Sequence, residues 1–222
     1  MGKRLRVGVV CDLASEGWPS MDLVADMLVR HLAAHDAGAI EAVPLRPELG
    51  RPHVWSGPRP PLSLASARRM VDRYWRYPGW LGRMAAGFDV FHVVDHSYAH
   101  LVHVLPAERT VVTCHDVDAF RALFDPACRE SRLPLMVVRR VLEGLRRAAV
   151  VACASEATRN ELVERGGIDA ARTLVVPNGI DLGKYPAPQP AGRQSLGIRQ
   201  ECRLATFVGR LAPQKGVQWL IQ

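Results

Sequence analysis

The sequence has little lysine, few aromatic residues and no long apolar run. Of its 29 basic residues only 3 are Lys and 26 are Arg, and aromatic residues make up 6% of the 222 positions. The longest uncharged apolar stretch, residues 148–154, has seven residues, whereas a helix needs about 20 to cross a bilayer. The sequence therefore predicts a soluble protein, or one that lies on a membrane surface.

Disulfide and metal-binding patterns are also missing. The five cysteines lie far apart, with no Cys-x-x-Cys pair and no His/Cys cluster at zinc spacing. Cys11, Cys114 and Cys153 each end an apolar run, which is typical of buried free thiols and favours a reduced compartment. The N-terminal apolar run 7–10 is too short for a signal peptide. We therefore expect a cytoplasmic protein without a bound metal, at most at the inner face of the membrane.

The charge balance is basic, because 29 Lys and Arg stand against 22 Asp and Glu and give a net charge of +7. Such a charge permits binding to phosphate, anionic lipid or nucleic acid but selects none of them. Nucleic acid is not predicted, since no helix-turn-helix, RRM or zinc-finger pattern occurs.

Two arginine-rich helical segments fit either of two interpretations. The first carries Arg68, Arg69, Arg73, Arg76 and Arg83 among Tyr74, Trp75, Tyr77 and Trp80, and the second carries Arg139, Arg140, Arg146 and Arg147. Arginine with aromatic residues suits a helix that meets anionic lipid, which gives a peripheral membrane contact. The alternative is a solvated face whose arginine stems cover apolar surface.

Short β-branched runs alternate with longer amphipathic patterns along the chain. Strands are expected at 5–11, 40–45, 89–94, 109–114, 150–154 and 173–177. Helices are expected at 21–35, 63–77, 135–148 and 155–165, with Pro78-Gly79 ending the second of them. Strands that alternate with helices indicate βαβ crossovers. The predicted fold class is α/β, with a doubly wound, mostly parallel, Rossmann-like sheet.

The domain organisation follows from a change in composition near residue 183. Residues 183–200 contain three closely spaced prolines and read as a linker. Beyond them only one strand, 204–208, and one helix, from about Gln214, are expected, and a single βα unit cannot bury a core. We therefore predict a domain at 1–182, a linker at 183–200 and, at 201–222, the first strand and helix of an incomplete second domain.

Polar residues follow each expected strand. In an open parallel sheet ligands bind at the carboxyl ends of the strands, so these residues are candidates for a cleft. They are Glu16 and Gly17, Asp95 and His96, His115 and Asp116, Ser155 and Glu156, and Asn178. For Asp12, Asp95 and Ser155 the alternative is that they only cap the helix that follows.

His115 is the most distinctive of these residues, because it follows the strand VVTC directly. Its imidazole is expected at the sheet edge, where it can donate a hydrogen bond to a substrate oxygen. The alternative is a core histidine that is bonded to a backbone carbonyl.

A basic turn follows the last expected strand. Gly209 opens it, and Arg210 and Lys215 bracket a loop that leads into a helix. Backbone N–H groups at a helix N-terminus together with two cations suit phosphate, particularly a diphosphate. The alternative is a surface turn that is merely basic.

Four segments in this order resemble a known family. They are HDVDAF (115–120), VVACASEATRNELVERGGID (150–169), VVPNGIDLGKY (175–185) and FVGRLAPQKGVQWLI (207–221). Together they resemble the family 4 group of GT-B glycosyltransferases, which are retaining enzymes that use nucleotide-activated sugars without a metal. The resemblance covers most of residues 5–222 and is specific from about 109 onward.

The resemblance implies two Rossmann-like domains that face each other across a cleft. The first holds the acceptor, which is a glycan, a lipid-linked molecule or a small molecule, and the second holds the nucleotide sugar. His115 would contact the transferred sugar, and Arg210 and Lys215, with Gly209 in the same donor-phosphate loop, would stabilise the leaving diphosphate. Asn178 would mark the domain junction. No cofactor is implied beyond the nucleotide-sugar substrate.

The sequence departs from the family pattern in two places. Its first loop reads Ser15-Glu16-Gly17-Trp18-Pro19, where the family usually has a Gly-Gly pair. The family's second domain also carries two glutamates eight positions apart that contact the donor, and this chain ends before them. We expect the chain to be part of a longer, retaining glycosyltransferase and to bind nucleotide sugar weakly by itself. The alternatives are a non-catalytic acceptor-binding or interaction domain and a GT-B-like sugar-nucleotide epimerase.

Overall fold

The computed structural model describes residues 4–35, 38–49, 62–125, 132–181, 192–199, 201–209, 211 and 215–221. The chain divides into two units, Met1–Asn178 and Gly179–Gln222, and each is described by itself. The first unit contains the sheet. Its strands are β1 (Leu5–Val10), β2 (Ile40–Leu45), β3 (Val90–Val93), β4 (Thr110–Cys114), β5 (Val150–Cys153) and β6 (Thr173–Val175).

The helices of the first unit include long α-helices and many short 3-10 turns. The α-helices are α1 (Pro19–His35), α2 (Leu62–Val71), α3 (Tyr77–Met84), α4 (Arg121–Phe124), α5 (Arg132–Arg147) and α6 (Glu156–Glu164). The 3-10 segments are η1 (Ala14–Glu16), η3 (Ala85–Gly87), η4 (His96–His103), η5 (Ala107–Arg109), η6 (Asp118–Phe120) and η7 (Ala170–Arg172), and η2 (Asp72–Arg76) is π-helical. The second unit has α7 (Gly192–Ser195) and α8 (Val217–Ile221).

The sheet has six parallel strands in the order β2-β1-β3-β4-β5-β6. Val7 of the inner strand β1 lies between Ala42 of β2 and Val90 of β3. The chain therefore winds outward from β1 in one direction, crosses back to β3 and continues in the other direction. This doubly wound topology confirms the predicted fold class, and its switch point lies between β1 and β3.

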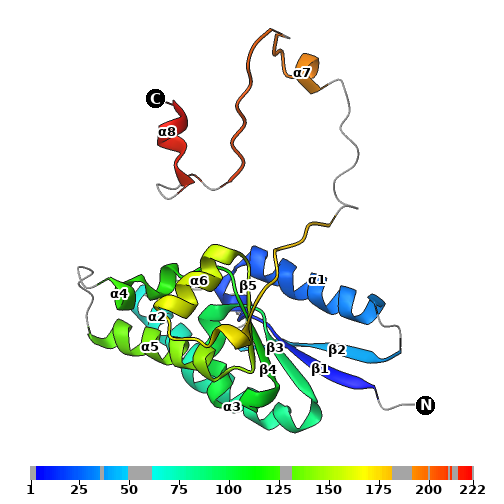
Figure 1. The fold of residues 1–222 in the computed structure, drawn as a ribbon, viewed down its shortest axis with the longest axis vertical. Coiled ribbons are helices and arrows are strands. Elements are labelled where there is room, and N and C mark those ends of the chain that lie inside the picture. The colour runs from blue at the N-terminus through cyan, green and yellow to red at the C-terminus, as the bar shows by residue number, and fades with distance from the viewer. Residues whose placement is uncertain are drawn as a thin grey trace. The chain divides into compact units, whose positions relative to one another are not determined.

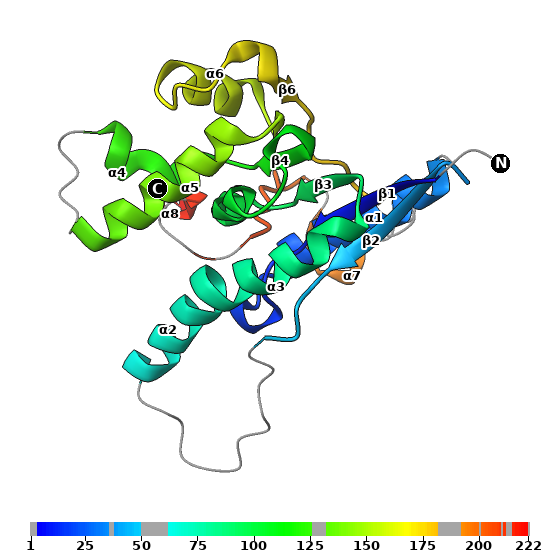
Figure 2. The ribbon, with the colours of Figure 1, turned by 90° about the horizontal axis from the view of Figure 1, so that it is seen from below.

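Alternate side chains of β1 enter different layers. Val7 and Val9 pack with Ala25 of α1 on one face of the sheet, whereas Val10 belongs to the larger cluster on the other face. In Figures 1 and 2, α1 lies on the first face, and α3 and α5 lie on the opposite one. Strands buried on both faces are expected in a parallel sheet, which explains the unbroken apolar run at the centre of β1.

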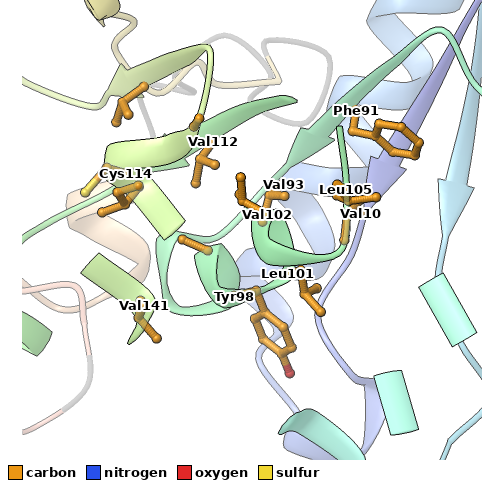
Figure 3. Packing of buried hydrophobic residues seen from close by; sticks show 14 of the residues in the cluster. Val10, Phe91, Val93, Tyr98, Leu101, Val102, Leu105, Val112, Cys114 and Val141 are labelled. Carbon is orange, nitrogen blue, oxygen red and sulfur yellow. The ribbon is translucent and has the colours of Figure 1, made fainter. Parts of the chain in front are cut away.

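The larger cluster is built around η4, which lies between the sheet and α5 (Figure 3). Tyr98, Leu101 and Val102 of η4 are fully or almost fully buried, together with Val93 of β3 and Val112 of β4. Helix α5 approaches η4 closely at Gly144, where a built Cβ atom would lie only 1.9 Å from the carbonyl oxygen of Ala99. The two backbones therefore meet without a side chain between them.

Two sequence predictions about the elements are wrong. Pro78 does not end a helix: the π-helical η2 runs from α2 directly into α3, and Pro78 is the second residue of α3. Residues 204–208 are not a strand, because a strand needs a hydrogen-bonded neighbour and none of the described residues pairs with them.

Other predictions are confirmed. The strand 40–45 has the predicted bounds, and the remaining five strands of the sheet are each one or two residues shorter than predicted. Cys11, Cys114 and Cys153 are buried and free.

Within the described part of the chain, no helix is long and apolar enough to cross a membrane. The domain limits at 182 and 200 stay predictions.

Gly144 gives a direct test of the contact between α5 and η4. Gly144→Ala should lower the free energy of unfolding by about 2 kcal/mol, because the added methyl group overlaps the Ala99 carbonyl and forces the backbones apart. Gly82→Ala in α3 is the matched control, since nothing lies within 4 Å of the added carbon. It should leave stability unchanged or raise it slightly. Urea unfolding measures both, and equal stability of the two variants would contradict the close contact.

Candidate functional site

The candidate site lies at the carboxyl ends of β1, β3 and β4, next to the switch point of the sheet. Asp12 follows β1, Asp95 and His96 follow β3, and His115 and Asp116 follow β4. The loops after β1 and β3 diverge at the switch point, so the residues on either side of it flank the natural position for a ligand. The structure thus brings together five polar residues that are far apart in sequence.

His115 is half-buried and has one ring nitrogen engaged. Its Nε2 lies 2.9 Å from the carbonyl oxygen of Val94, and a carbonyl only accepts, so Nε2 carries the hydrogen. In the neutral imidazole Nδ1 is then an acceptor. The sequence predicted a hydrogen bond donated to a substrate oxygen, with a core histidine bonded to a backbone carbonyl as the alternative. In the structure Nε2–H is bonded to the backbone, as in that alternative, and Nδ1 is left as an acceptor.

His96 lies behind His115 and contacts it through the backbone. The Nδ1 atom of His96 is 3.4 Å from the amide nitrogen of His115 and 3.3 Å from Oδ1 of Asp95. Its Nε2 is 3.8 Å from Oδ1 of the exposed Asp116. Burial lowers the pKa of His96 and outweighs the attraction of Asp95 and Asp116.

Asp95 is held in place by its own turn. Its carboxylate accepts the backbone N–H of Ser97 at 2.9 Å and the Ser97 hydroxyl at 2.5 Å, so it caps η4. Burial alone would raise the pKa of Asp95, but His96, the bonds from Ser97 and the charge of Arg73 together hold it below its usual value. The capping alternative is confirmed for Asp95, and the cap keeps the carboxylate ionised beside His96.

Arg73 was predicted to be exposed, but its side chain is largely buried. It was assigned to an exposed basic face, yet only 16% of its side chain is exposed. Its Nη1 donates to both carboxylate oxygens of Glu16, at 2.9 and 3.1 Å, its Nη2 donates to the Ser97 carbonyl at 2.6 Å, and its guanidinium lies 4.0 Å from the ring centre of Tyr98. Glu16, expected in the cleft, therefore has a structural partner.

The burial of Asp12 without a hydrogen-bond partner is the other feature that the sequence did not predict. Only 3% of the residue is exposed, and neither carboxylate oxygen has a hydrogen-bond partner among the described residues. Burial, followed by the neighbouring charge of Asp95, raises the pKa of Asp12 to about 8. Asp12 does not cap a helix, because the 3-10 turn η1 begins two residues later without a side-chain cap.

The remaining candidates lie at the edge of the first unit or in the second unit. Ser155 accepts the Thr158 N–H and caps α6, as the capping alternative proposed. Glu156 and Asn178 are exposed. Gly17 ends η1 in the left-handed region, with φ 66°, which explains glycine at this position.

The predicted phosphate-binding turn belongs to the second unit. Lys215 is exposed and lies two residues before α8, and Gly209 is also exposed. Arg210 lies outside the described residues. The role of these three residues as a donor-phosphate site stays a prediction.

The cluster offers hydrogen-bonding groups to a ligand. Among the residues that the structure describes, no three His, Cys, Asp or Glu side chains are grouped so that they could hold a metal ion. Besides the buried Asp12, the groups with remaining hydrogen-bonding capacity are the Nδ1 atom of His115 and the exposed carboxylate of Asp116, which suit the hydroxyl groups of a polar substrate.

Comparison with known proteins gives consistent matches. The model of Glycosyltransferase Family 4 matches residues 23–184. The D-inositol 3-phosphate glycosyltransferases of Gordonia bronchialis and Segniliparus rotundus are 42% identical over 69 residues and 31% identical over 114 residues. These alignments cover 31% and 48% of this chain, and 15% and 24% of the relatives.

Solved structures also match. The structure of Anabaena Alr3699/HepE in complex with UDP and glucose has 16% sequence identity and a TM-score of 0.48, with 87% of this chain and 50% of that chain covered. The chain thus spans about half of that solved chain, and its matches span a quarter or less of these curated relatives.

The Arg73 contacts can be tested without any substrate. Arg73→Lys keeps the charge but loses the planar group that reaches Glu16 and Ser97 while it stacks on Tyr98. Thermal unfolding should show a loss of roughly 2 kcal/mol. Arg69→Lys is the control, since Arg69 is exposed and should tolerate the exchange. An equally small effect at both positions would show that the buried contacts contribute little.

Proposed function

Because the chain belongs to Glycosyltransferase Family 4, we propose that it forms the acceptor-side part of a glycosyltransferase that transfers a sugar from a nucleotide-sugar donor with retention. The observation that carries the proposal is the position of His115, directly after β4 and within the matched residues, with Nδ1 left to accept a hydroxyl. Hydrogen bonds from sugar hydroxyls to fixed acceptors orient a substrate without charge.

The acceptor proposed for the first tests is a polyol phosphate. Relatives that match this chain over short stretches are named D-inositol 3-phosphate glycosyltransferases. An inositol ring offers several hydroxyl groups to Asp116 and to the Nδ1 atom of His115, both at the same edge of the sheet. The donor base is left open between uridine and guanosine.

The leaving diphosphate needs positive charge, and the basic turn of the second unit is proposed to supply it. Arg210 and Lys215 carry full charges in a segment that runs into α8. Two cations near the diphosphate would stabilise the charge that develops as the glycosidic bond breaks.

A peripheral membrane contact is a further part of the proposal. With Arg73 and Tyr77 buried, the exposed residues of the first basic segment are Trp75, which is 81% exposed, and Arg68, Arg69, Arg76 and Arg83. An exposed indole among arginines suits the headgroup region of an anionic bilayer.

The transferase proposal is tested by product analysis. Two proteins are assayed: the 222-residue chain and the product of any reading frame that continues past Gln222. Each is incubated with UDP- and GDP-sugars and D-inositol 3-phosphate. Mass spectrometry detects the glycoside, and NMR of the anomeric proton reports retention. His115→Ala should lower kcat/KM by about a hundredfold, because the sugar loses its orienting acceptor. His31→Ala, at an exposed position on α1, should leave it unchanged.

Two results would contradict the proposal. Tight acceptor binding without transfer in either protein would indicate a non-catalytic binding domain. A changed sugar that is still attached to its nucleotide would indicate an epimerase.

The membrane contact is tested by flotation with vesicles that contain anionic or only zwitterionic phospholipid. Binding should require the anionic lipid, and Trp75→Ala should weaken it several-fold. Trp80→Ala, at a half-buried position, is the aromatic control. Absence of binding to anionic vesicles would end this part of the proposal.

A further inference from the structure

A cavity of about 240 Å³ lies between α4, α5 and the end of α6 in the first unit. Its lining residues are Leu123 and Phe124 of α4, Arg139, Leu142, Glu143 and Arg146 of α5, and Arg165, which caps α6. In Figure 2, α4 and α5 lie beside each other. None of the lining residues belongs to the candidate site at the strand ends.

The wall of this cavity has an excess of positive charge. Three of its side chains are arginines, and Glu143 is its one carboxylate. Arg165 already forms an ion pair with Glu161 at 3.6 Å. Neither Arg139 nor Arg146 forms an ion pair with any residue that the structure describes. Two guanidinium groups therefore line the cavity with their charge unmatched.

Arg146 is held in place by the turn after α6. Its Nε donates to the carbonyl oxygen of Gly166 at 2.7 Å. Its guanidinium also lies against Gly167, since a Cβ atom built on that glycine would be 3.6 Å from Nη2. Nε is the only guanidinium nitrogen bonded to the described residues, so both Nη atoms keep their N–H groups for a ligand.

The floor of the cavity is apolar. Leu142 is 4% exposed, and the half-buried Leu123 and Phe124 pack against the larger core cluster. The cavity has the volume of about eight water molecules in the liquid, and it is smaller than the sites that enclose drug-sized ligands. Its occupant is therefore a small anion that also carries a few carbon atoms.

We propose that this cavity binds a small, soluble phosphate monoester. The phosphate would accept hydrogen bonds from Arg139 and Arg146, and its carbon part would lie against Phe124. A phosphate suits two guanidinium groups better than a carboxylate does, because it has three terminal oxygens and a second negative charge. This site goes beyond the proposed function and does not depend on it, since it uses neither the donor turn nor the residues around His115.

The composition of α5 favours a soluble ligand over a lipid surface. Among its described side chains, at 135–147, Met136 is the one large apolar group that is exposed. Its other large apolar residues, including Val141 and Leu145, face the core. A helix that lies on a bilayer needs an apolar face to insert. The arginines of the second basic segment are therefore better suited to a ligand in the cavity than to a membrane.

Binding is tested by NMR of the 222-residue chain during titration with glycerol phosphate. The side-chain Nε signal of Arg146 and the ring signals of Phe124 should shift and reach saturation. Glycerol alone should shift neither, because the arginines recognise the phosphate. Equal shifts with glycerol, or no saturable shift with glycerol phosphate, would overturn the proposal.

Two double variants with the same loss of charge locate the site. Arg139→Gln with Arg146→Gln should weaken binding by about tenfold or more, because the charged donors are lost. Arg140→Gln with Arg147→Gln is the matched control, since both residues are exposed on α5 and line no part of the cavity. It should weaken binding by less than about twofold through long-range charge. Equal losses would overturn the proposed site.

Two single variants keep the test decisive if the loss of the Arg146 bond prevents folding. Arg139→Gln breaks no bond to the described residues and should still weaken binding several-fold. Glu143→Gln should strengthen binding, by about threefold, because it removes a negative charge from the wall. A damaged fold cannot produce this gain. Unchanged or weaker binding by Glu143→Gln would contradict a phosphate in this cavity.

The source of the phosphate is tested with vesicles that contain phosphatidic acid, whose headgroup is the same phosphate monoester. The wild type and Arg139→Gln with Arg146→Gln should float with these vesicles equally, because the proposed membrane contact lies at Trp75. Flotation that is lost in the double variant, together with no binding of glycerol phosphate, would overturn the soluble ligand in favour of a lipid headgroup.

Discussion

The first unit depends on the burial of one guanidinium group. A buried charge stabilises a fold only when its lost hydration is replaced, and around Arg73 the Glu16 carboxylate, the Ser97 carbonyl and the face of Tyr98 replace it. These groups come from the turn after β1 and from η4, while Arg73 belongs to the π-helical turn between α2 and α3. One side chain thus joins three segments. Because η4 starts at His96, the same contacts also place the candidate site.

The switch point of the sheet sets a second constraint, which is electrostatic. The chain leaves β1 and β3 in opposite directions there, and both strands are followed by an aspartate. The two carboxyl groups meet in a buried place, where a pair of charges is costly. The two carboxyl groups differ in their hydrogen-bond donors. Asp95 accepts two hydrogen bonds from Ser97, whereas Asp12 accepts none from the described residues. Polar residues at a strand end can therefore serve each other rather than solvent.

Local patterns predicted most of the fold, and long-range pairing explains what they missed. The apolar runs and helical stripes gave all six strands and α1, α5 and α6, because each pattern is repeated within a few residues. The predicted helix end at Pro78 is wrong, since a π-helical turn precedes this proline and the helix continues through it. The burial of Arg73 depends on Glu16, 57 positions away, and the state of Asp12 depends on Asp95. Neither pairing leaves a periodic trace in the sequence, although His115 and its neighbours were found from their place after strands.

The hydrogen bond from Nε2 of His115 to Val94 limits which groups can orient the sugar and which can stabilise the leaving group in the proposed reaction. With its Nε2–H bonded to the Val94 carbonyl, His115 has only Nδ1 left for the substrate, and this nitrogen can orient one hydroxyl group. Charge developing on a leaving diphosphate must then be met by cations. In the first unit the best-placed cation, Arg73, is already bonded to Glu16 and Ser97. We propose Arg210 and Lys215 of the second unit for this role, and the first unit for binding the sugar and the acceptor.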